Sequence, residues 1–440
     1  MKTGQNLAHI PGPAPLPVIG HTLQVVRDAY GSQQKYIDAY GPVYKTKVLG
    51  VWHINLCGPD AMEMVLTDRN EVFSSKSGWD AIADLFAGGL MLQDFAHHRQ
   101  NRRIMQSAFR ASALKHYRSA ILAALEEMIR NCPKGQTFQF YTAVKELTLR
   151  IGCSVFIGLE PDDPQADTLN QALVDQIHAA MSVLRKPLPF SAMRKGIRAR
   201  DLLRERLRKM IPERRRNGGN DFFSQMCCAR DEVGQGWNED EILDQFNFLM
   251  MAAHDTTASA LTAIIWLLAA HPEWQVRIQD ELRALGPDLL SENALADMVQ
   301  TDLVIKEALR LVPPVPFIPR RVMKDFEWQG HVIPAGASVT VNPGVTMMSP
   351  DIYTNPEKFD PLRFAPGRAE DRAHKFAWAP FGGGAHKCIG MHFAIMEIKM
   401  FLAVLLGKHR ITLATDTPPR WSRLPIPKPS CGLPIQIHKV

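Results

Sequence analysis

The sequence predicts a mainly α-helical protein with small β-sheets. From Ala111 to about Arg216, apolar residues recur mostly at helical spacing. β-Branched residues instead concentrate in two short segments, residues 43–57 and 326–342, on either side of this helical region. Because strand-forming segments flank a helical middle, and no repeat or low-complexity linker interrupts the chain, we expect one interleaved domain over residues 1–440.

The composition is that of an ordinary globular protein. Of the 440 residues, 46% are hydrophobic and 22% are charged, with 29 glycines and 31 prolines. These fractions exclude disordered, collagen-like and disulfide-scaffold proteins. The net charge of +6, from 51 basic and 45 acidic residues, is too small to indicate a nucleic-acid partner.

The cysteines and the N-terminus indicate a cytoplasmic protein. Seven cysteines are scattered without a C-x-x-C pair, which argues against a disulfide framework, a zinc site and an oxidising compartment. Residues 1–20 form a stiff, Pro-rich N-terminal segment without an apolar stretch long enough for a signal sequence. The longest apolar run, residues 263–270, is far shorter than the ~18 residues of a membrane span. We therefore expect a soluble monomer without a transmembrane anchor.

Both β-branched segments are predicted to form hairpins. In residues 43–57 the strand pattern is broken at Leu49-Gly50, and in residues 326–342 a turn is expected at Pro334-Ala335-Gly336.

One long helix is predicted over residues 238–271. Asn238 and Glu241 have the spacing of a capping box, and helical spacing continues to Pro272. A helix of about 33 residues is roughly 50 Å long and must cross the whole protein. Its middle, residues 252–257, places Asp255 and Thr256 in an otherwise apolar rod. Burying such groups unpaired costs several kcal/mol, so they need a partner or a function.

Two interpretations of these polar residues in the middle of the helix stay open. In the first, Asp255 and Thr256 do chemistry, and the small residues Ala252 and Ala253 let a flat group approach the helix. In the second, they belong to a solvated face, or the threonine bonds back to a carbonyl of its own helix.

The strongest chemical signal is the loop at residues 381–390, FGGGAHKCIG. Its glycines let the backbone fold tightly around one sulfur, that of Cys388. A helical pattern follows at once, and the N-terminus of a helix favours a thiolate. A single thiolate in a glycine loop suits an axial ligand of haem iron. The alternative is a buried cysteine beside a glycine turn.

This loop resembles the haem-binding loop of the cytochrome P450 family, F-x-x-G-x-[HR]-x-C-x-G. The matching positions are Phe381, Gly384, His386, Cys388 and Gly390. Other segments, in the family's order along the chain, resemble further motifs of the family. Glu307 and Arg310 match E-x-x-R, and Arg363 lies in FDPLRF, where Leu362 replaces the family's glutamate. Residues 252–256 are similar to [AG]-G-x-[DE]-T, with Ala253 at the second glycine. Residues 98–102 are similar to W-x-x-x-R, with His98 in place of tryptophan.

The resemblance implies a single-domain cytochrome P450 fold with haem b between the long helix and the helix after the Cys loop. Cys388 would ligate the iron, and Asp255 with Thr256 would deliver protons for oxygen activation. Glu307, Arg310 and Arg363 would form a buried clamp on the Cys loop. The haem propionates would be bound by Arg102, His98, His386 and Arg320, although Arg321 is an alternative to Arg320.

The implied function is a monooxygenase that hydroxylates a hydrophobic small molecule: a terpenoid, retinoid, steroid or fatty acid. The residues resemble most the retinoid- and sterol-oxidising branch and its soluble bacterial relatives. Dioxygen is the cosubstrate. Because the sequence has no flavin, dinucleotide or iron–sulfur motif, two electrons would come ultimately from NAD(P)H through a ferredoxin or flavodoxin with its reductase. Alternatives are a haem-thiolate sensor without turnover, a lipid-binding protein, and a haem-thiolate isomerase or dehydratase.

Other residues suggest where ligands bind. Apolar residues that either line a substrate pocket or belong to the ordinary core are Trp79, Phe86, Leu90, Phe248, Leu249, Ala252, Val315, Phe317 and Leu433. Basic residues that either dock an acidic redox partner or merely favour solubility are Arg99, Arg103, Arg110, Lys375, Lys387 and Lys399. The basic stretch from Arg194 to Arg216 is expected to be a solvated helix face, with a membrane surface or nucleic acid as alternatives.

Overall fold

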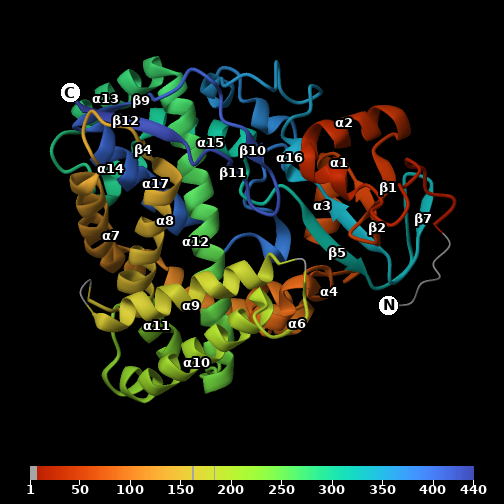
Figure 1. Ribbon diagram of the computed structural model, residues 1–440, viewed down its shortest axis with the longest axis horizontal. Helices are drawn as coiled ribbons and strands as arrows, with labels where there is room; N and C mark the ends of the chain where they lie inside the picture. Colours follow the sequence, from red (N-terminus) through yellow and green to blue (C-terminus); the bar gives the residue numbers. More distant parts are fainter. Residues whose placement is uncertain (1–6, 161–162, 183) are drawn as a thin grey trace. The chain divides into compact units, whose positions relative to one another are not determined.

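The computed structural model describes residues 7–160, 163–182 and 184–440 (Figure 1). The first six residues of the predicted Pro-rich segment lie outside these ranges. The chain forms two compact units, each assembled from separate stretches of sequence. The first comprises Met1–Trp79, Asp302–Cys388 and Pro419–Cys431, and the second comprises Asp80–Thr301, Ile389–Pro418 and Gly432–Val440.

The first unit contains a five-stranded sheet with short helices. Its helices are α1 (Thr22–Arg27), α2 (Ala29–Tyr40), α3 (Pro59–Thr67), α4 (Ser75–Gly78), α15 (Val299–Leu311, from Asp302 onward), α16 (Pro343–Thr346), η5 (Pro361–Phe364), η6 (Glu370–Ala373) and η7 (Gly384–His386). Its strands are β1 (Val43–Val48), β2 (Val51–Leu56), β3 (Phe73–Ser74), β5 (Ile318–Val322), β6 (Phe326–Trp328), β7 (His331–Ile333), β8 (Ser338–Val341), β10 (Trp421–Ser422) and β11 (Lys428–Pro429).

The main sheet has the strand order β1-β2-β8-β5-β3. β2 and β8 pair in parallel, with Ile54 opposite Val339, and the other neighbours are antiparallel. The β1–β2 hairpin confirms the prediction for residues 43–57. Leu49 and Gly50 both take positive φ, as a tight two-residue hairpin turn requires.

The prediction for residues 326–342 is wrong in its pairing. The hairpin there joins β6 to β7 through Gln329-Gly330, which both have positive φ. The turn expected at Pro334-Ala335-Gly336 exists, but it leads into β8, which joins the main sheet. The segment contains two adjacent turn sequences, Gln329-Gly330 and Pro334-Ala335-Gly336. Pairing of β8 with β2 and β5 in the main sheet buries all four β8 residues, which favours it over a local hairpin.

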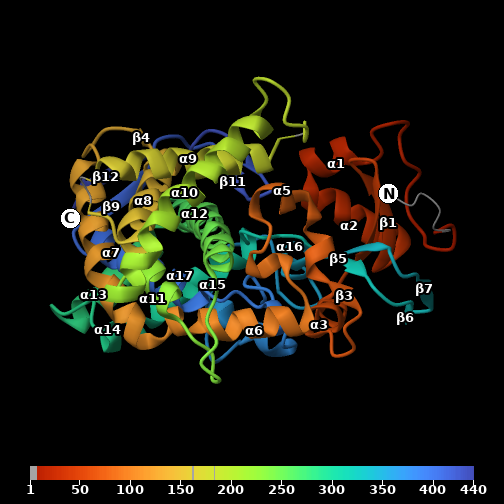
Figure 2. The ribbon, with the colours of Figure 1, turned by 90° about the horizontal axis from the view of Figure 1, so that it is seen from below.

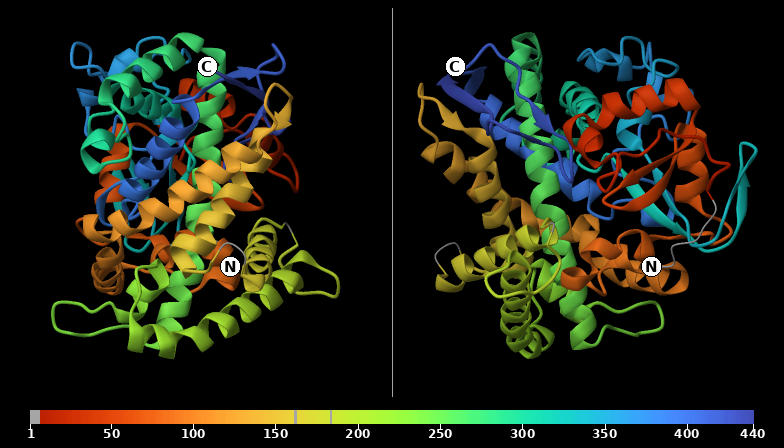
Figure 3. Two further views of the ribbon diagram at one scale, coloured as in Figure 1. Left: turned by 90° about the vertical axis from the view of Figure 1, so that its left-hand side faces the viewer. Right: turned by 45° about the vertical axis from the view of Figure 1, so that its right-hand side comes forward.

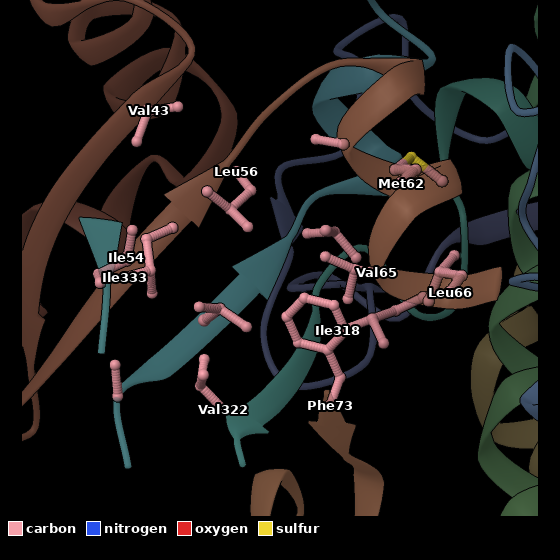
Figure 4. Close-up of a cluster of buried hydrophobic side chains, with 14 of the residues drawn as sticks. Val43, Ile54, Leu56, Met62, Val65, Leu66, Phe73, Ile318, Val322 and Ile333 are labelled. Atoms are coloured by element: carbon pink, nitrogen blue, oxygen red, sulfur yellow. The ribbon is translucent and has the colours of Figure 1, made fainter. Parts of the chain in front are cut away.

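A hydrophobic core packs α3 against the main sheet (Figure 4). Met62, Val65 and Leu66 of α3 meet sheet residues such as Leu56 and Ile318. Phe376 and Ala379, just before the Cys loop, belong to the same cluster. The sheet core therefore also anchors the chain segment that leads to Cys388.

The second unit is mostly helical. Its helices are η1 (Asp80–Ile82), α5 (Ala83–Phe86), η2 (Leu90–Leu92), α6 (Phe95–Gln106), η3 (Ser107–Phe109), α7 (Ala111–Asn131), α8 (Phe140–Ile151), the π-helical η4 (Gly152–Ile157), α9 (Pro164–Ala180), α10 (Ala192–Asn217), α11 (Phe222–Cys228), α12 (Glu239–Ala270), α13 (Pro272–Leu285), α14 (Glu292–Ala296) and α17 (Met391–Leu406). Strands β4 (Phe138–Gln139), β12 (Pro434–Lys439) and β9 (His409–Leu413) form a small sheet in that order.

The predicted long helix is α12, which has 32 residues and begins with the Asn238–Glu241 capping box. It packs against α8 and α17 within the second unit (Figure 3). In the described part of the chain, α12 alone has the length and hydropathy of a membrane span. However, 72% of its most apolar window is buried, which is typical of a core helix.

Helix α10 contains the basic stretch from Arg194 to Arg216 and lies alongside α9 (Figures 1 and 2). Several of its cations are used in ion pairs within the unit. Arg204 and Arg208 both pair with Asp240 at the start of α12, at 2.9 and 2.6 Å. Arg214 pairs with Asp221 at 3.0 Å. These contacts favour the interpretation as an ordinary helix face that also packs onto its neighbours.

Candidate active site

Cys388 lies in a loop whose shape is fixed by backbone hydrogen bonds. Its N–H donates to the carbonyl oxygen of Phe381 at 2.9 Å, and the N–H of Lys387 donates to that of Gly384 at 3.2 Å. The Cys388 side chain is exposed, three residues before the first residue of α17. The loop therefore presents one sulfur at its surface.

Gly384 fits this loop tightly against α3. Its φ is +60°, and a Cβ atom at this position would overlap the Leu66 carbonyl oxygen and lie closer to the Thr67 Cα atom than ordinary van der Waals contact allows. Both neighbours are backbone atoms, which cannot rotate away. The close approach of the loop to α3 thus requires glycine at this position.

We expect Gly384→Ala to prevent haem incorporation, because the loop would have to move away from α3. Gly382→Ala is a matched control: Gly382 also has positive φ (+66°), but the nearest atom to its added Cβ is Ile318 Cδ1 at 3.8 Å. Backbone strain should destabilise the control by only about 1 kcal/mol, and the control should keep its haem. The ratio of haem absorbance to protein in the purified variants measures this, and equal haem content in both would contradict the expectation.

Glu307 on α15 joins two fully buried arginines. It accepts hydrogen bonds from Arg310 at 2.7 and 2.9 Å, from Arg363 Nε at 3.1 Å, and from the backbone N–H of Asp360 at 2.9 Å. The side chains of all three charged residues are 0% exposed. Because an isolated buried charge is very costly, these contacts are needed for the charges to stay in the interior.

The two arginines also donate hydrogen bonds to the chain between α16 and η5. Arg310 donates to the carbonyl oxygens of Met347 and Pro356 at 2.9 and 2.7 Å, and Arg363 donates to that of Thr354 at 3.0 Å. The ring of Tyr353 lies against both guanidinium groups, with centroid distances of 4.9 and 5.7 Å. The cluster thereby organises residues 347–360 around itself.

Two hydrogen bonds connect this cluster to the segment before the Cys loop. Tyr353 Oη donates to the carbonyl oxygen of Ala377 at 3.0 Å. Trp378 Nε1 donates to the carbonyl oxygen of Lys306 on α15 at 2.9 Å, and its ring contacts that of Phe381 at 6.1 Å between centroids. The predicted contacts among Glu307, Arg310 and Arg363 are thus present. That they clamp the Cys loop stays a prediction, which these bonds support.

The donor set at Cys388 fits haem. Among the described residues, no group of three or more His, Cys, Asp or Glu side chains could hold a metal ion. A single protein ligand suffices when a porphyrin supplies four further ligands to iron, and a lone thiolate is one of the ligands that haem iron accepts. An exposed sulfur on a glycine-rich loop with its own backbone hydrogen bonds meets this requirement.

Asp255 on α12 is paired with Lys145 on α8, at 3.0 Å between Oδ1 and Nζ. Its side chain is 13% exposed and that of Lys145 is 27% exposed. The hydroxyl group of Thr256 donates to the carbonyl oxygen of Ala252 at 2.7 Å. This hydrogen bond within the helix is the second of the two interpretations of Thr256 that the sequence analysis gave. It occupies the hydroxyl hydrogen but leaves the oxygen able to accept a hydrogen bond.

A family model described as cytochrome P450 matches residues 10–431. The chain belongs to the cytochrome P450 family. Putative cytochrome P450 136 of Mycobacterium tuberculosis (strain H37Rv) is 36% identical over 440 residues, with 99% of this chain and 89% of that protein covered. Human cytochrome P450 26C1 is 31% identical, with 96% of this chain and 87% of that protein covered.

A solved cytochrome P450 structure shares the fold. Cyanobacterial CYP120A1 with retinoic acid bound matches with a TM-score of 0.88 and 30% identity, covering 98% of this chain and 99% of that one. The predicted mainly helical cytochrome P450 fold is confirmed, as is the prediction of a cytochrome P450 monooxygenase. Members of this family bind haem through a thiolate, use dioxygen and a hydrophobic substrate, and take electrons from redox partners.

The residues predicted to bind the propionates fall in both units. On α6, His98 is buried and Arg102 is half-buried. His386 is half-buried in η7, within the Cys loop (residues 381–390). Arg320 is 4% exposed, on the same face of β5 as Ile318 and Val322, whereas Arg321 is on the other face. The strand alternation thus distinguishes the two arginines, and a binding role for Arg320 stays a prediction.

The residues predicted to line the substrate pocket are also divided between the units. Phe86, Leu90, Phe248, Leu249, Ala252 and Leu433 belong to the second unit, and Trp79, Val315 and Phe317 to the first. Phe248 packs closely against Gly89, next to Leu90. Val315 packs on the core of the main sheet, and Phe317 contacts the ring of Tyr30 at 6.4 Å. These last two contacts favour a core role for Val315 and Phe317.

One of the basic residues assigned to partner docking was wrongly placed on the surface. Lys399 is 6% exposed, and its Nζ donates to the carbonyl oxygen of Leu295 at 2.7 Å. Its place on α17, among apolar residues, buries it. Lys375 is exposed but pairs with Glu63. The side chains of Arg99, Arg103, Arg110 and Lys387 are exposed.

The sequence analysis missed three polar residues near His254 and Asp255. Lys145 and Thr148 lie on α8, and Glu397 interrupts the apolar pattern of α17. Thr148 occupies a position between the buried residues Val144 and Ile151, where an apolar side chain is expected. A polar residue inside a buried stripe was the available signal in both helices.

Proposed function

We propose that this cytochrome P450 hydroxylates a hydrophobic carboxylic acid of the retinoid type, using dioxygen and two electrons from a separate partner protein. The observation that carries the proposal is the exposed Cys388 sulfur on a loop that packs closely against α3 and follows a segment hydrogen-bonded to the Glu307 cluster. The substrate class is supported by the retinoic acid bound to the cyanobacterial structure that this chain resembles.

Haem bound through Cys388 would supply the oxidising chemistry that inserts one oxygen atom into a C–H bond. The residues of the chain then have distinct tasks. The Cys388 thiolate holds the cofactor, and hydrogen bonds within the loop keep the sulfur in place. Thr256 offers a hydroxyl oxygen as an acceptor, and Asp255, one residue earlier, carries protons from the partly exposed Lys145 side of α12.

The electrons come, in this proposal, from a ferredoxin or flavodoxin that an NAD(P)H-dependent reductase reduces. The 440 residues contain no flavin-binding or iron–sulfur motif. The exposed cations Arg99, Arg103, Arg110 and Lys387 are the proposed contacts for the acidic partner. Substrates of the terpenoid, steroid and fatty-acid classes are the comparisons against which a retinoid has to be tested.

The test is a titration of the ferric holoprotein with all-trans-retinoic acid, retinol, a long-chain fatty acid and a steroid. We expect retinoic acid to shift the iron spin state at the lowest concentration and to yield a hydroxylated product with a surrogate ferredoxin and reductase. Retinol has the same chain without the carboxylate, so equal affinity would overturn the acid part of the proposal. Binding without oxygen consumption would instead favour a haem-thiolate sensor or lipid-binding protein.

Thr256→Ala is expected to leave haem binding intact but to divert electrons into peroxide, several-fold more than in the wild type. Thr262→Ala is a matched control, because Thr262 lies on the same helix and its hydroxyl also donates to the carbonyl oxygen four residues earlier, at 2.6 Å. Product formed per NAD(P)H consumed is the measurement. Unchanged coupling in Thr256→Ala, or the same loss in both variants, would show that Thr256 acts only within its helix.

A further inference from the structure

A groove on the second unit lies between α7, α14 and α17. α17 packs against both of the other helices, and the three are close together in Figures 1 and 2. The volume of the groove is about 260 Å³. Small-molecule sites in proteins typically start at about 300 Å³, so the groove has room for one small ligand.

The floor of the groove is apolar. Leu295 of α14 is 7% exposed, and Leu114 of α7 is half-buried. α17 adds Ile395 and Met396, which are also half-buried. Side chains from three helices therefore leave part of their hydrocarbon surface in contact with water at one place. A ligand with a hydrocarbon chain would remove that surface from water, which is favourable.

Cations surround this apolar floor. Lys115 of α7 is exposed, and Arg118, about one turn later, is half-buried. Arg118 Nη1 donates to the carbonyl oxygen of Leu290 at 3.2 Å, and Lys399 Nζ donates to that of Leu295 at 2.7 Å. These bonds hold two of the cations beside α14. A guanidinium group has five N–H donors, so Arg118 keeps others for a ligand.

The charges at the groove are unbalanced. Three lysine and arginine side chains line it, whereas Glu292 is the only carboxylate among the described residues of the lining. Neither Lys115 nor Arg118 forms an ion pair with another described residue. His392, in the first turn of α17, is a further basic side chain and is exposed. The excess of cations favours an anion, and charge-assisted hydrogen bonds from lysine and arginine suit a carboxylate.

We propose that this groove is a second ligand site, which binds an amphipathic carboxylate with a chain of medium length. Lys115 and Arg118 contact the carboxylate, and the hydrocarbon chain covers Leu295 and Ile395. A neutral hydrocarbon would leave the cations without a counter-ion, and a small inorganic anion would leave the floor in contact with water. The described residues that line the groove include neither Cys388 nor any residue predicted to line the substrate pocket. The site is therefore separate from the one that the proposed function uses.

The test is a calorimetric titration of the ferric holoprotein with decanoate. The haem site is first filled with an azole that ligates the iron, so that decanoate in the substrate pocket is not counted. Decanol and decyltrimethylammonium have the same chain with a neutral and a positive head group. We expect one decanoate to bind per protein, and decanol to bind about tenfold more weakly because a charge-assisted hydrogen bond is lost. The ammonium compound should not bind.

Two outcomes of this titration would overturn the proposal. Equal affinity for decanoate and decanol would show that the cations do not recognise the carboxylate. Failure of decanoate to bind would exclude the small-molecule site and favour a side chain of a partner protein as the occupant. No turnover is needed, so the result does not depend on the proposed function.

Substitutions show whether decanoate binds in this groove. Lys115→Gln combined with Arg118→Gln should weaken decanoate binding about tenfold but leave decanol binding unchanged, because only contacts to the carboxylate are removed. Lys115→Gln alone, at an exposed position where folding is not affected, should give part of this loss. Ile395→Asn should weaken the binding of both compounds, because it places a polar group on the apolar floor.

Arg130→Gln is the matched control. Arg130 is an exposed cation in the last turn of α7, outside the lining of the groove. We expect this variant to bind decanoate like the wild type. Wild-type affinity for decanoate in the double variant, or an equal loss in the Arg130 variant, would overturn the assignment of the ligand to this groove.

Discussion

Cys388→Ser is expected to abolish the strongly red-shifted Soret band that a thiolate-ligated haem gives when the reduced protein binds carbon monoxide. A serine oxygen is a much harder ligand than sulfur and does not donate electron density to iron in the same way. The exposed sulfur belongs to a loop that is fixed by its own backbone bonds and by α3. The substitution should therefore remove the ligand without reshaping the loop.

The matched control is Cys431→Ser. Cys431 is also exposed and belongs to the same unit, but it lies outside the Cys loop. We expect its band to equal that of the wild type, and we expect the Cys388 variant to lose hydroxylation of every substrate. A red-shifted band that survived Cys388→Ser, or that was lost in both variants, would assign the iron ligand to another residue and remove the basis of the proposed function.

Local patterns predicted the parts of this molecule that depend on a few neighbouring residues. The capping box at Asn238, the turn at Leu49-Gly50 and the pairing of Glu307 with Arg310 three residues later are all short-range features. Local patterns could not predict which strands pair when those strands lie far apart in the sequence. Strand β8 joins β2, which is separated from it by more than half of the chain, and the sequence near residue 334 contains a turn signal in either arrangement.

Burial of charge was the harder part to predict from the residues. Lys399 and Glu397 lie two positions apart on α17, and their sequence does not say that both are inside the protein. Lys399 is paired with a backbone carbonyl, whereas Glu397 lines a small cavity together with His254 of α12. The partner of Asp255 was missed for a similar reason, because Lys145 comes from α8, more than 100 residues earlier. Such contacts depend on how whole helices pack.

Glu307→Gln is expected to prevent accumulation of folded holoprotein. The glutamine amide removes the negative charge between Arg310 and Arg363 and places N–H donors against their N–H donors. Two guanidinium groups with 0% exposure would then lack their shared counter-ion. Breaking a buried ion pair on one side costs about 3–5 kcal/mol. That is a large fraction of the 5–15 kcal/mol by which folded proteins are typically stable. The loss would reach Cys388 through Tyr353 and Trp378.

Glu370→Gln separates this effect from the mere loss of a carboxylate at Arg363. Glu370 also pairs with Arg363, at 2.6 Å, but its side chain is 13% exposed. It forms a second ion pair with Arg368, whose side chain is 39% exposed. Water can replace part of that interaction, so the loss should be smaller than for Glu307. Soluble yield, haem content and the midpoint of thermal unfolding should therefore fall sharply for Glu307→Gln and only moderately for Glu370→Gln. Equal losses would mean that burial of Glu307 adds nothing, and that the three-residue cluster does not hold the Cys loop.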